Sequence, residues 1–103
     1  MTTSEFHILL SLADGARHGY AIMREVELRS AGQVKLGPGT LYGAIQRMLE
    51  SGWIEETEDS EEGERRRYYM LTAEGRQAVS EEAARLQQMV KLAQSKKILP
   101  ARG

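Results

Sequence analysis

The residues best placed to do chemistry lie in one segment, Gly37 to Gly52. Pro38 suits the first position of a helix, where its missing N–H needs no partner, and Gly52 suits the left-handed residue just past a helix. The apolar residues recur at helical spacing and are Leu41, Ile45, Met48 and Leu49. The polar and small residues of the other face are Gly39, Thr40, Tyr42, Gly43, Gln46 and Arg47. Because a helix amino terminus attracts anions, we expect this face to meet a phosphate backbone and, through its Gln and Arg, base edges.

A second basic group lies further along the chain, at Arg65, Arg66 and Arg67. Alternate residues of a strand face opposite sides, so all three side chains cannot point the same way. We predict that Arg65 and Arg66 contact a phosphate or the minor groove, and that Lys35 neutralises a phosphate beside the helix. The alternative is that the arginines pair with carboxylates of the preceding strand, which would leave this region neutral. Those carboxylates are Glu55, Glu56 and Glu58.

Little in the sequence favours catalysis. There are no cysteines, so neither a disulfide framework nor a thiolate metal site can form. His7 and His18 lack metal-ligand spacing to each other or to a pair of carboxylates, and we find no phosphate loop or Ser–His–Asp set. We therefore expect no enzyme activity, no metal and no cofactor.

Size and charge indicate one domain with a local basic face. The chain has 103 residues and a net charge of −1, which argues against indiscriminate nucleic-acid binding but not against a basic patch. No apolar run approaches the roughly 18 residues of a membrane span, and the amino terminus lacks the pattern of a signal peptide. We expect a cytoplasmic, nucleoid-associated protein.

Periodicity predicts a mainly α fold with a β hairpin. We expect helices over 4–13, 18–31 and 38–51, a brief strand over 34–36, hairpin strands over 53–58 and 66–71, and a last helix from 72 to about 96. Thr3 or Ser4 should cap the first helix; Tyr20 should face inward and Glu25 outward from the second; Trp53 should lie under the hairpin. This is the order of a winged helix-turn-helix followed by a long C-terminal helix.

The last helix carries an apolar stripe longer than one small domain can cover. Its members recur near heptad spacing and are Val79, Ala83, Leu86, Val90 and Ala93, with Met89 beside them. Such a stripe favours contact with a second chain. We expect a winged-helix domain over 1–75, a dimerisation helix over 76–97 and a frayed tail over 98–103.

Four motifs in this order resemble the PadR family of bacterial transcriptional regulators, over residues 7–79. They are His18-Gly19-Tyr20, Gly39-Thr40-Leu41-Tyr42, Leu49-Glu50-Ser51-Gly52-Trp53-Ile54, and Arg66-Arg67-Tyr68-Tyr69-Met70-Leu71-Thr72 with Gly75 beyond. The chain departs from the family at Gly43 and Ala44, where relatives often have proline. A single helix after the hairpin is typical of the short-tailed type.

The resemblance implies a homodimer that binds an inverted-repeat operator in double-stranded DNA and represses nearby genes. In relatives the C-terminal helix packs on helix 1 of the partner, which adds Phe6 and Leu9 to the predicted interface. Some relatives release DNA when a flat aromatic effector stacks on an aromatic residue of the last helix. Here the stretch 76–97 has no aromatic residue.

Two functions remain open from the sequence. The first is a dimeric, sequence-specific DNA-binding regulator whose two recognition helices enter successive major grooves about 34 Å apart. The second is a winged-helix protein-interaction module without a DNA role, which the negative net charge and the acidic residues near the hairpin tip would favour.

Overall fold

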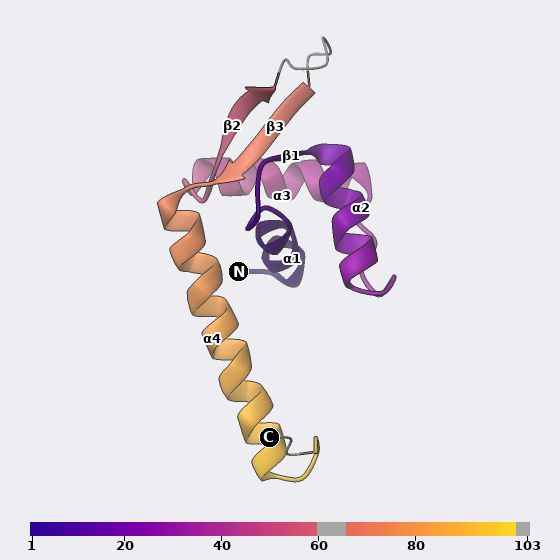
Figure 1. Cartoon of the computed structure of the whole chain (residues 1–103), viewed down its shortest axis with the longest axis vertical. Helices are drawn as coiled ribbons and strands as arrows, with labels where there is room; N and C mark the ends of the chain where they lie inside the picture. Colours follow the sequence, from indigo (N-terminus) through magenta and orange to yellow (C-terminus); the bar gives the residue numbers. More distant parts are fainter. Residues whose placement is uncertain (60–65, 101–103) are drawn as a thin grey trace.

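The computed structural model describes residues 1–59 and 66–100, and Figure 1 shows how its elements follow one another. Within these ranges the chain forms four helices and three short strands. The helices are α1 (Thr3–Ser11), α2 (Gly19–Arg29), α3 (Pro38–Glu50) and α4 (Ala73–Ser95); the strands are β1 (Arg17–His18), β2 (Ile54–Asp59) and β3 (Arg66–Leu71). The expected mainly α fold with a hairpin and a long last helix is confirmed.

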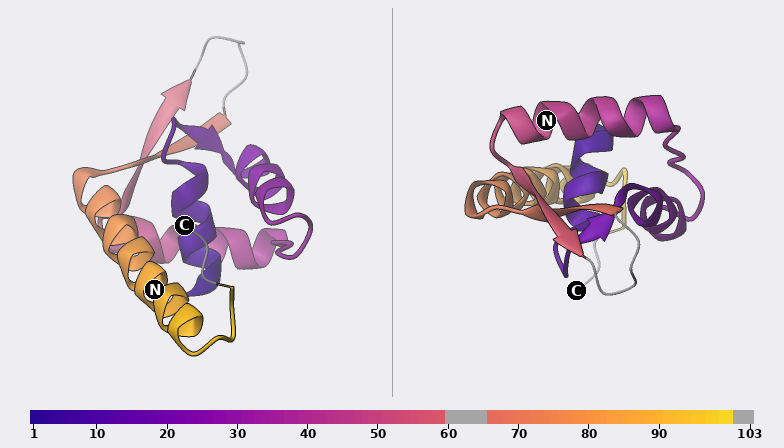
Figure 2. Two further views of the ribbon diagram at one scale, coloured as in Figure 1. Left: turned by 60° about the horizontal axis from the view of Figure 1, so that its bottom comes forward. Right: turned by 90° about the horizontal axis from the view of Figure 1, so that it is seen from above.

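The core lies where α1, α2 and α3 meet, and the sheet extends it. Figure 2 shows α1 at the centre, with α2 on one side and the start of α4 on the other. The largest fully buried side chains are Ile8, Leu9, Leu12, Ile22, Val26, Leu41 and Met48. Ile54 of β2, Tyr69 of β3 and Val79 of α4 join the same cluster, so the hairpin and the last helix are both anchored to the helical core.

The central helix begins at the predicted residue, Pro38, and ends at Glu50, one residue before the predicted end. Pro38 occupies the first helical position, and Gly52 has φ +78°, the left-handed geometry that glycine adopts without strain. The N–H of Trp53 then donates to the carbonyl of Met48 at 3.0 Å, which closes the helix. Trp53 is partly buried and packs against the core, as expected.

The amino-terminal cap of α1 differs from the expectation. Neither Thr3 nor Ser4 is the cap; Thr2 is, and it forms a capping box with Glu5. The Thr2 hydroxyl accepts the Glu5 N–H at 3.1 Å, and the Glu5 carboxylate accepts the Thr2 N–H at 2.8 Å. This reciprocal pair satisfies two helix N–H groups at once, which a cap at either later residue would not do.

The predicted strand over 34–36 is wrong, and the third strand lies elsewhere. The Val34 N–H donates to the Ser30 hydroxyl at 3.0 Å rather than to a neighbouring strand, and Leu36 turns into the core with 8% exposure. The apolar alternation there reflects burial, not a ladder. The actual edge strand is β1, whose Arg17 and His18 pair with Tyr69 and Tyr68 of β3, giving the order β1-β3-β2.

Two side chains of α2 also differ from the sequence prediction. Tyr20 is 60% exposed, and the Arg24 guanidinium lies 5.8 Å from the centroid of its ring. Ile22 and Val26 fill the buried side of the helix. Glu25, expected in solvent, is partly buried between Arg17 and Arg29, at 3.2 and 2.6 Å.

The first two turns of α4 pack against the rest of the chain, where Gly75 and Val79 are buried. Thr72 caps it, accepting the Gly75 N–H at 3.0 Å, and its hydroxyl also donates to the Gly52 carbonyl at 2.5 Å. Beyond Val79 most side chains of α4 are exposed or half-buried. Figure 1 shows the helix running away from the hairpin toward the opposite end of the molecule. None of the described helices has the combined length and apolar character of a membrane span.

Candidate nucleic-acid interface

The start of α3 is open on its outer face. Its N-cap, Gly37, has no side chain with which to cap the first N–H groups. The predicted contact residues of this helix are all exposed, namely Gly39, Thr40, Tyr42, Gly43, Gln46 and Arg47. The apolar residues Leu41, Ile45 and Met48 point the other way, into the core. The helix therefore presents uncapped N–H groups and small polar side chains outward, which is the arrangement that attracts a phosphate.

The two longest predicted contact residues of α3 are held by carboxylates of the chain itself. Gln46 donates to Glu50 at 3.1 Å, and the Arg47 Nε lies 3.3 Å from an Oε of Glu5. Burial alone would raise the pKa of Glu5, but hydrogen bonds from Thr2 and the Arg47 guanidinium outweigh it and lower that pKa. Arg47 therefore faces a charged carboxylate at neutral pH, and to reach a base it must leave that partner.

The arginines of β3 point to different partners, as strand alternation requires. The Arg67 Nε lies 3.5 Å from Glu56 on β2, which matches the pairing alternative for that residue. The Arg66 Nη1 lies 3.0 Å from the His18 Nε2 of β1. Arg65, the other predicted contact of this region, lies outside the described residues. The described part of the hairpin thus places Arg66 next to the start of α2 and ties Arg67 to its neighbouring strand.

A cavity of about 420 Å³ connects these elements. It lies between the start of α2, the first turns of α3 and the return strand, and its lining residues are His18, Gly19, Tyr20, Tyr42, Arg66, Arg67 and Tyr69. Burial, the Glu56 carboxylate and Tyr42 raise the pKa of Tyr69, so its phenol remains neutral. The cavity is therefore lined by aromatic rings and cationic or neutral donors, which suits an anion.

His18 and Tyr20 were not predicted as site residues, although both line this cavity. His18 accepts the Ala21 N–H at 3.2 Å, which makes it the N-cap of α2, and its ring meets Tyr68 edge-on at 5.4 Å. The helical pattern predicts Tyr20 in the core and so gives no sign that it lines this cavity. The motif His18-Gly19-Tyr20 was the available signal, but only the tertiary structure brings it next to Tyr42 and Arg66. Lys35, a predicted contact, is exposed in the segment between α2 and α3.

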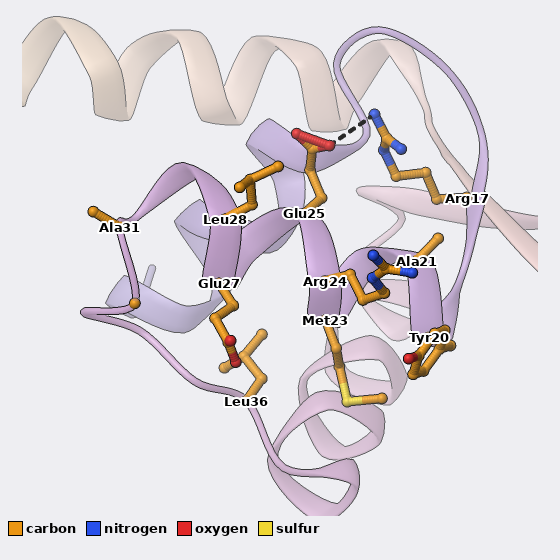
Figure 3. A pocket seen from close by; sticks show the side chains of 11 residues that line it. Arg17, Tyr20, Ala21, Met23, Arg24, Glu25, Glu27, Leu28, Ala31 and Leu36 are labelled. Carbon is orange, nitrogen blue, oxygen red and sulfur yellow. Dashed lines mark ion pairs between the residues drawn. The ribbon is translucent and has the colours of Figure 1, made fainter.

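A larger hollow, of about 890 Å³, follows the outer side of α2. Figure 3 shows Tyr20, Arg24 and Leu28 along this helix, Leu36 on the segment that follows it, and the Arg17–Glu25 ion pair at the top of the view. Its charges are of both signs and partly paired with each other. Among the described residues no group of three or more histidine, aspartate or glutamate side chains could hold a metal ion.

The predicted dimer residues range from exposed to fully buried in the single chain. Met89 and Val90 are 49% and 45% exposed, Ala83 is exposed, and Leu86, Ala93 and Phe6 are intermediate. Leu92, which was not predicted, is also 48% exposed. Two of the predicted interface residues pack inside their own protomer: Leu9 is 0% exposed and Val79 is 7% exposed.

Comparison with known proteins places the chain in one family. Residues 8–81 match the model of the transcriptional regulator PadR-like family, and the chain belongs to that family of transcriptional regulators. It is 31% identical over 85 residues to the transcriptional regulator Rv3488 of Mycobacterium tuberculosis, covering 82% of this chain and 77% of that protein. It is 42% identical over 76 residues to an uncharacterized 37.1 kDa protein in transposon TN4556 of Streptomyces fradiae. That match covers 74% of this chain, which spans 21% of the transposon protein.

Solved structures share the fold. A PadR family transcription regulator from Clostridium difficile superposes with a TM-score of 0.79 at 25% identity, covering 91% of this chain and 97% of that one. Bacillus subtilis PadR, solved in complex with operator DNA, superposes with a TM-score of 0.71, covering 80% of this chain and 47% of that one. At 18% identity this second similarity establishes the winged-helix fold alone.

Proposed function

We propose that this PadR-like regulator is a dimeric, sequence-specific DNA-binding repressor of genes near its own. The observation that carries the proposal is the open amino end of α3, with its small and polar outer face next to a cavity lined by Tyr42, Tyr20 and Arg66. The similarity to a PadR bound to operator DNA supports it. A regulator of this kind acts in the cytoplasm, on the nucleoid.

In this proposal the two kinds of contact have different tasks. The N–H groups of Gly39 and Thr40, the Tyr42 hydroxyl, Lys35 and Arg66 hold phosphates and fix the register of the protein on the duplex. Gln46 and Arg47 enter the major groove, where an amide can read adenine and a guanidinium can read guanine. Arg47 exchanges its contact with Glu5 for a base, so recognition by this residue competes with a contact inside the protein.

The dimer is proposed from the exposed side of α4. Met89 and Val90 are about half exposed on the same side of α4 as Leu86, and burying such apolar area against a second copy is favourable. Leu86→Asp should yield a monomer with an intact winged helix and lost operator binding, because it places a charge among these residues. A monomeric mass for the wild type at micromolar concentration would contradict the dimer.

DNA binding is tested by titrating labelled duplexes while anisotropy is recorded. One duplex carries the region upstream of the protein's own gene, and the control is a scrambled duplex of the same length and composition. We expect tighter binding to the upstream region, with log Kd changing by about 0.9 per phosphate for each decade of salt. Equal, salt-insensitive binding to both duplexes would favour the protein-interaction alternative.

Release by a small aromatic effector is a separate part of the proposal. It is supported by the family resemblance only, and α4 has no aromatic side chain on which a flat ligand could stack. Adding planar phenolic compounds to the protein–operator complex tests it directly. Unchanged anisotropy up to millimolar concentration would remove the effector while leaving DNA binding intact.

A further inference from the structure

Tyr42 of α3 lies directly against the first residue of α2. A Cβ atom added to Gly19 would be 2.9 Å from the Tyr42 Cζ and 3.3 Å from its Cε1, and closer still to the phenolic oxygen. Gly19 is buried. Any side chain at position 19 would therefore occupy the space in which the end of the Tyr42 side chain now lies.

This close contact is specific to Gly19 among the glycines near the proposed DNA surface. A Cβ at Gly39 would meet nothing within 4 Å, and a Cβ at Gly43 would meet only the Arg47 Nη1 at 3.7 Å, an ordinary contact. Tyr42 is 49% exposed, so its ring could turn outward if it were pushed. An alanine at position 19 is then expected to move the hydroxyl and leave the backbone in place.

The Tyr42 hydroxyl lies among groups that could bind a phosphate together. It belongs to the lining of the cavity that also contains His18, Tyr20 and Arg66, so α2, α3 and β3 meet at this point. A hydroxyl fixed among these groups can donate to a phosphate without first losing rotamer freedom, and this raises affinity.

We propose that Gly19 is a positioning residue for DNA binding that acts through Tyr42. Its bare backbone lets the phenol lie across the start of α2 and holds the hydroxyl where a backbone phosphate can accept from it. The inference rests on the proposed DNA-binding function and deepens it, because it assigns a task to a residue that itself touches no DNA.

The test is a double-mutant cycle with the wild type, Gly19→Ala, Tyr42→Ala and the double variant. The Kd for the upstream duplex and for the scrambled duplex, and the urea midpoint, are measured for all four proteins. We expect Gly19→Ala to weaken binding to both duplexes by at least about tenfold, since each of two protomers loses one hydrogen bond to a charged group. In the Tyr42→Ala background the same glycine change should leave both Kd values unchanged, because the atoms it displaces are gone.

Each outcome decides one claim. If the wild type binds neither duplex in a salt-dependent way, the proposed function fails and this inference fails with it. If the wild type binds and Gly19→Ala binds equally well, or if its effect adds fully to that of Tyr42→Ala, only the positioning role is overturned. If Gly19→Ala alone unfolds the chain, the double variant should regain the fold, and a double variant that stays unfolded refutes the contact with Tyr42 as the cause.

Discussion

Gly75, in the first turn of α4, tests how the long helix is joined to the hairpin. Its N–H caps onto Thr72, and a Cβ here would lie 2.7 Å from the carbonyl carbon of Trp53, 3.1 Å from its Cα and closer still to its oxygen. These are backbone atoms that cannot swing aside. The Trp53 N–H is bonded to Met48 and its carbonyl accepts the Thr72 N–H at 3.1 Å, so relief requires α4 itself to shift.

The size of the effect follows from two opposing terms. Forcing a methyl group into a packed site costs about 1–3 kcal/mol, and we expect the upper end here because the obstacle is backbone. Alanine in place of glycine favours a helix by about 0.5–1 kcal/mol. Gly75→Ala should therefore lower the free energy of unfolding by about 2 kcal/mol, or the melting temperature by about 8–16 °C for a chain of this size.

The matched control is Gly43→Ala in α3. A Cβ there meets only the end of the Arg47 side chain, at 3.7 Å. Only the higher helix propensity of alanine then acts, and it should raise the free energy of unfolding by about 0.5–1 kcal/mol. Urea unfolding followed by circular dichroism, at one fixed protein concentration, compares both variants with the wild type. Opposite signs are expected. A Gly75→Ala protein as stable as the wild type would refute the steric argument.

Three further changes test other contacts. Glu5→Gln should lower the free energy of unfolding by at most about 1 kcal/mol at pH 7, because Arg47 is more than half exposed and well solvated. Since the pKa of Glu5 in the folded protein is lowered from 4.5, this loss of stability should be complete above pH 4.5 and should vanish as the pH falls through the folded pKa. A loss of stability that grows on acidification would contradict this. Arg66→Gln should reduce the salt slope of DNA binding by about 1.8, which is 0.9 for each of two protomers. The control is Arg85→Gln, which should leave the slope unchanged, because Arg85 lies on α4 and pairs with Glu82 at 2.7 Å. Thr72→Ala should cost about 1 kcal/mol in urea unfolding through loss of the α4 cap, and an unchanged midpoint would show that the cap is dispensable.

The parts of the fold that local chemistry specifies were predictable from sequence. Pro38 and Gly52 bracket α3 because one fits a helix start and the other a left-handed stop. The hairpin strands follow from two β-prone runs separated by polar residues, and the start of α4 agrees with the preference for threonine at an N-cap, here Thr72. Each of these depends on neighbours within a few residues.

What could not be predicted depends on contacts far apart in the chain. The strand β1 is two residues long and exists only because β3, some 50 positions later, pairs with it. The ion pair of Arg47 with Glu5 spans 42 positions, and the contact of Gly19 with Tyr42 joins two helices. The sequence therefore predicts which residues of α3 face outward, but not the partners that hold the side chains of Gln46 and Arg47.

A hydroxyl-radical footprint on the region upstream of the protein's own gene tests the central claim most directly. Two recognition helices related by a two-fold axis should protect two patches about 10 base pairs apart, one helical turn, arranged symmetrically about a dyad. Arg66→Gln should weaken both patches equally, since both protomers carry the change. A uniform cleavage pattern at saturating protein, or one patch without a symmetry mate, would contradict the account of a dimer that reads an inverted repeat.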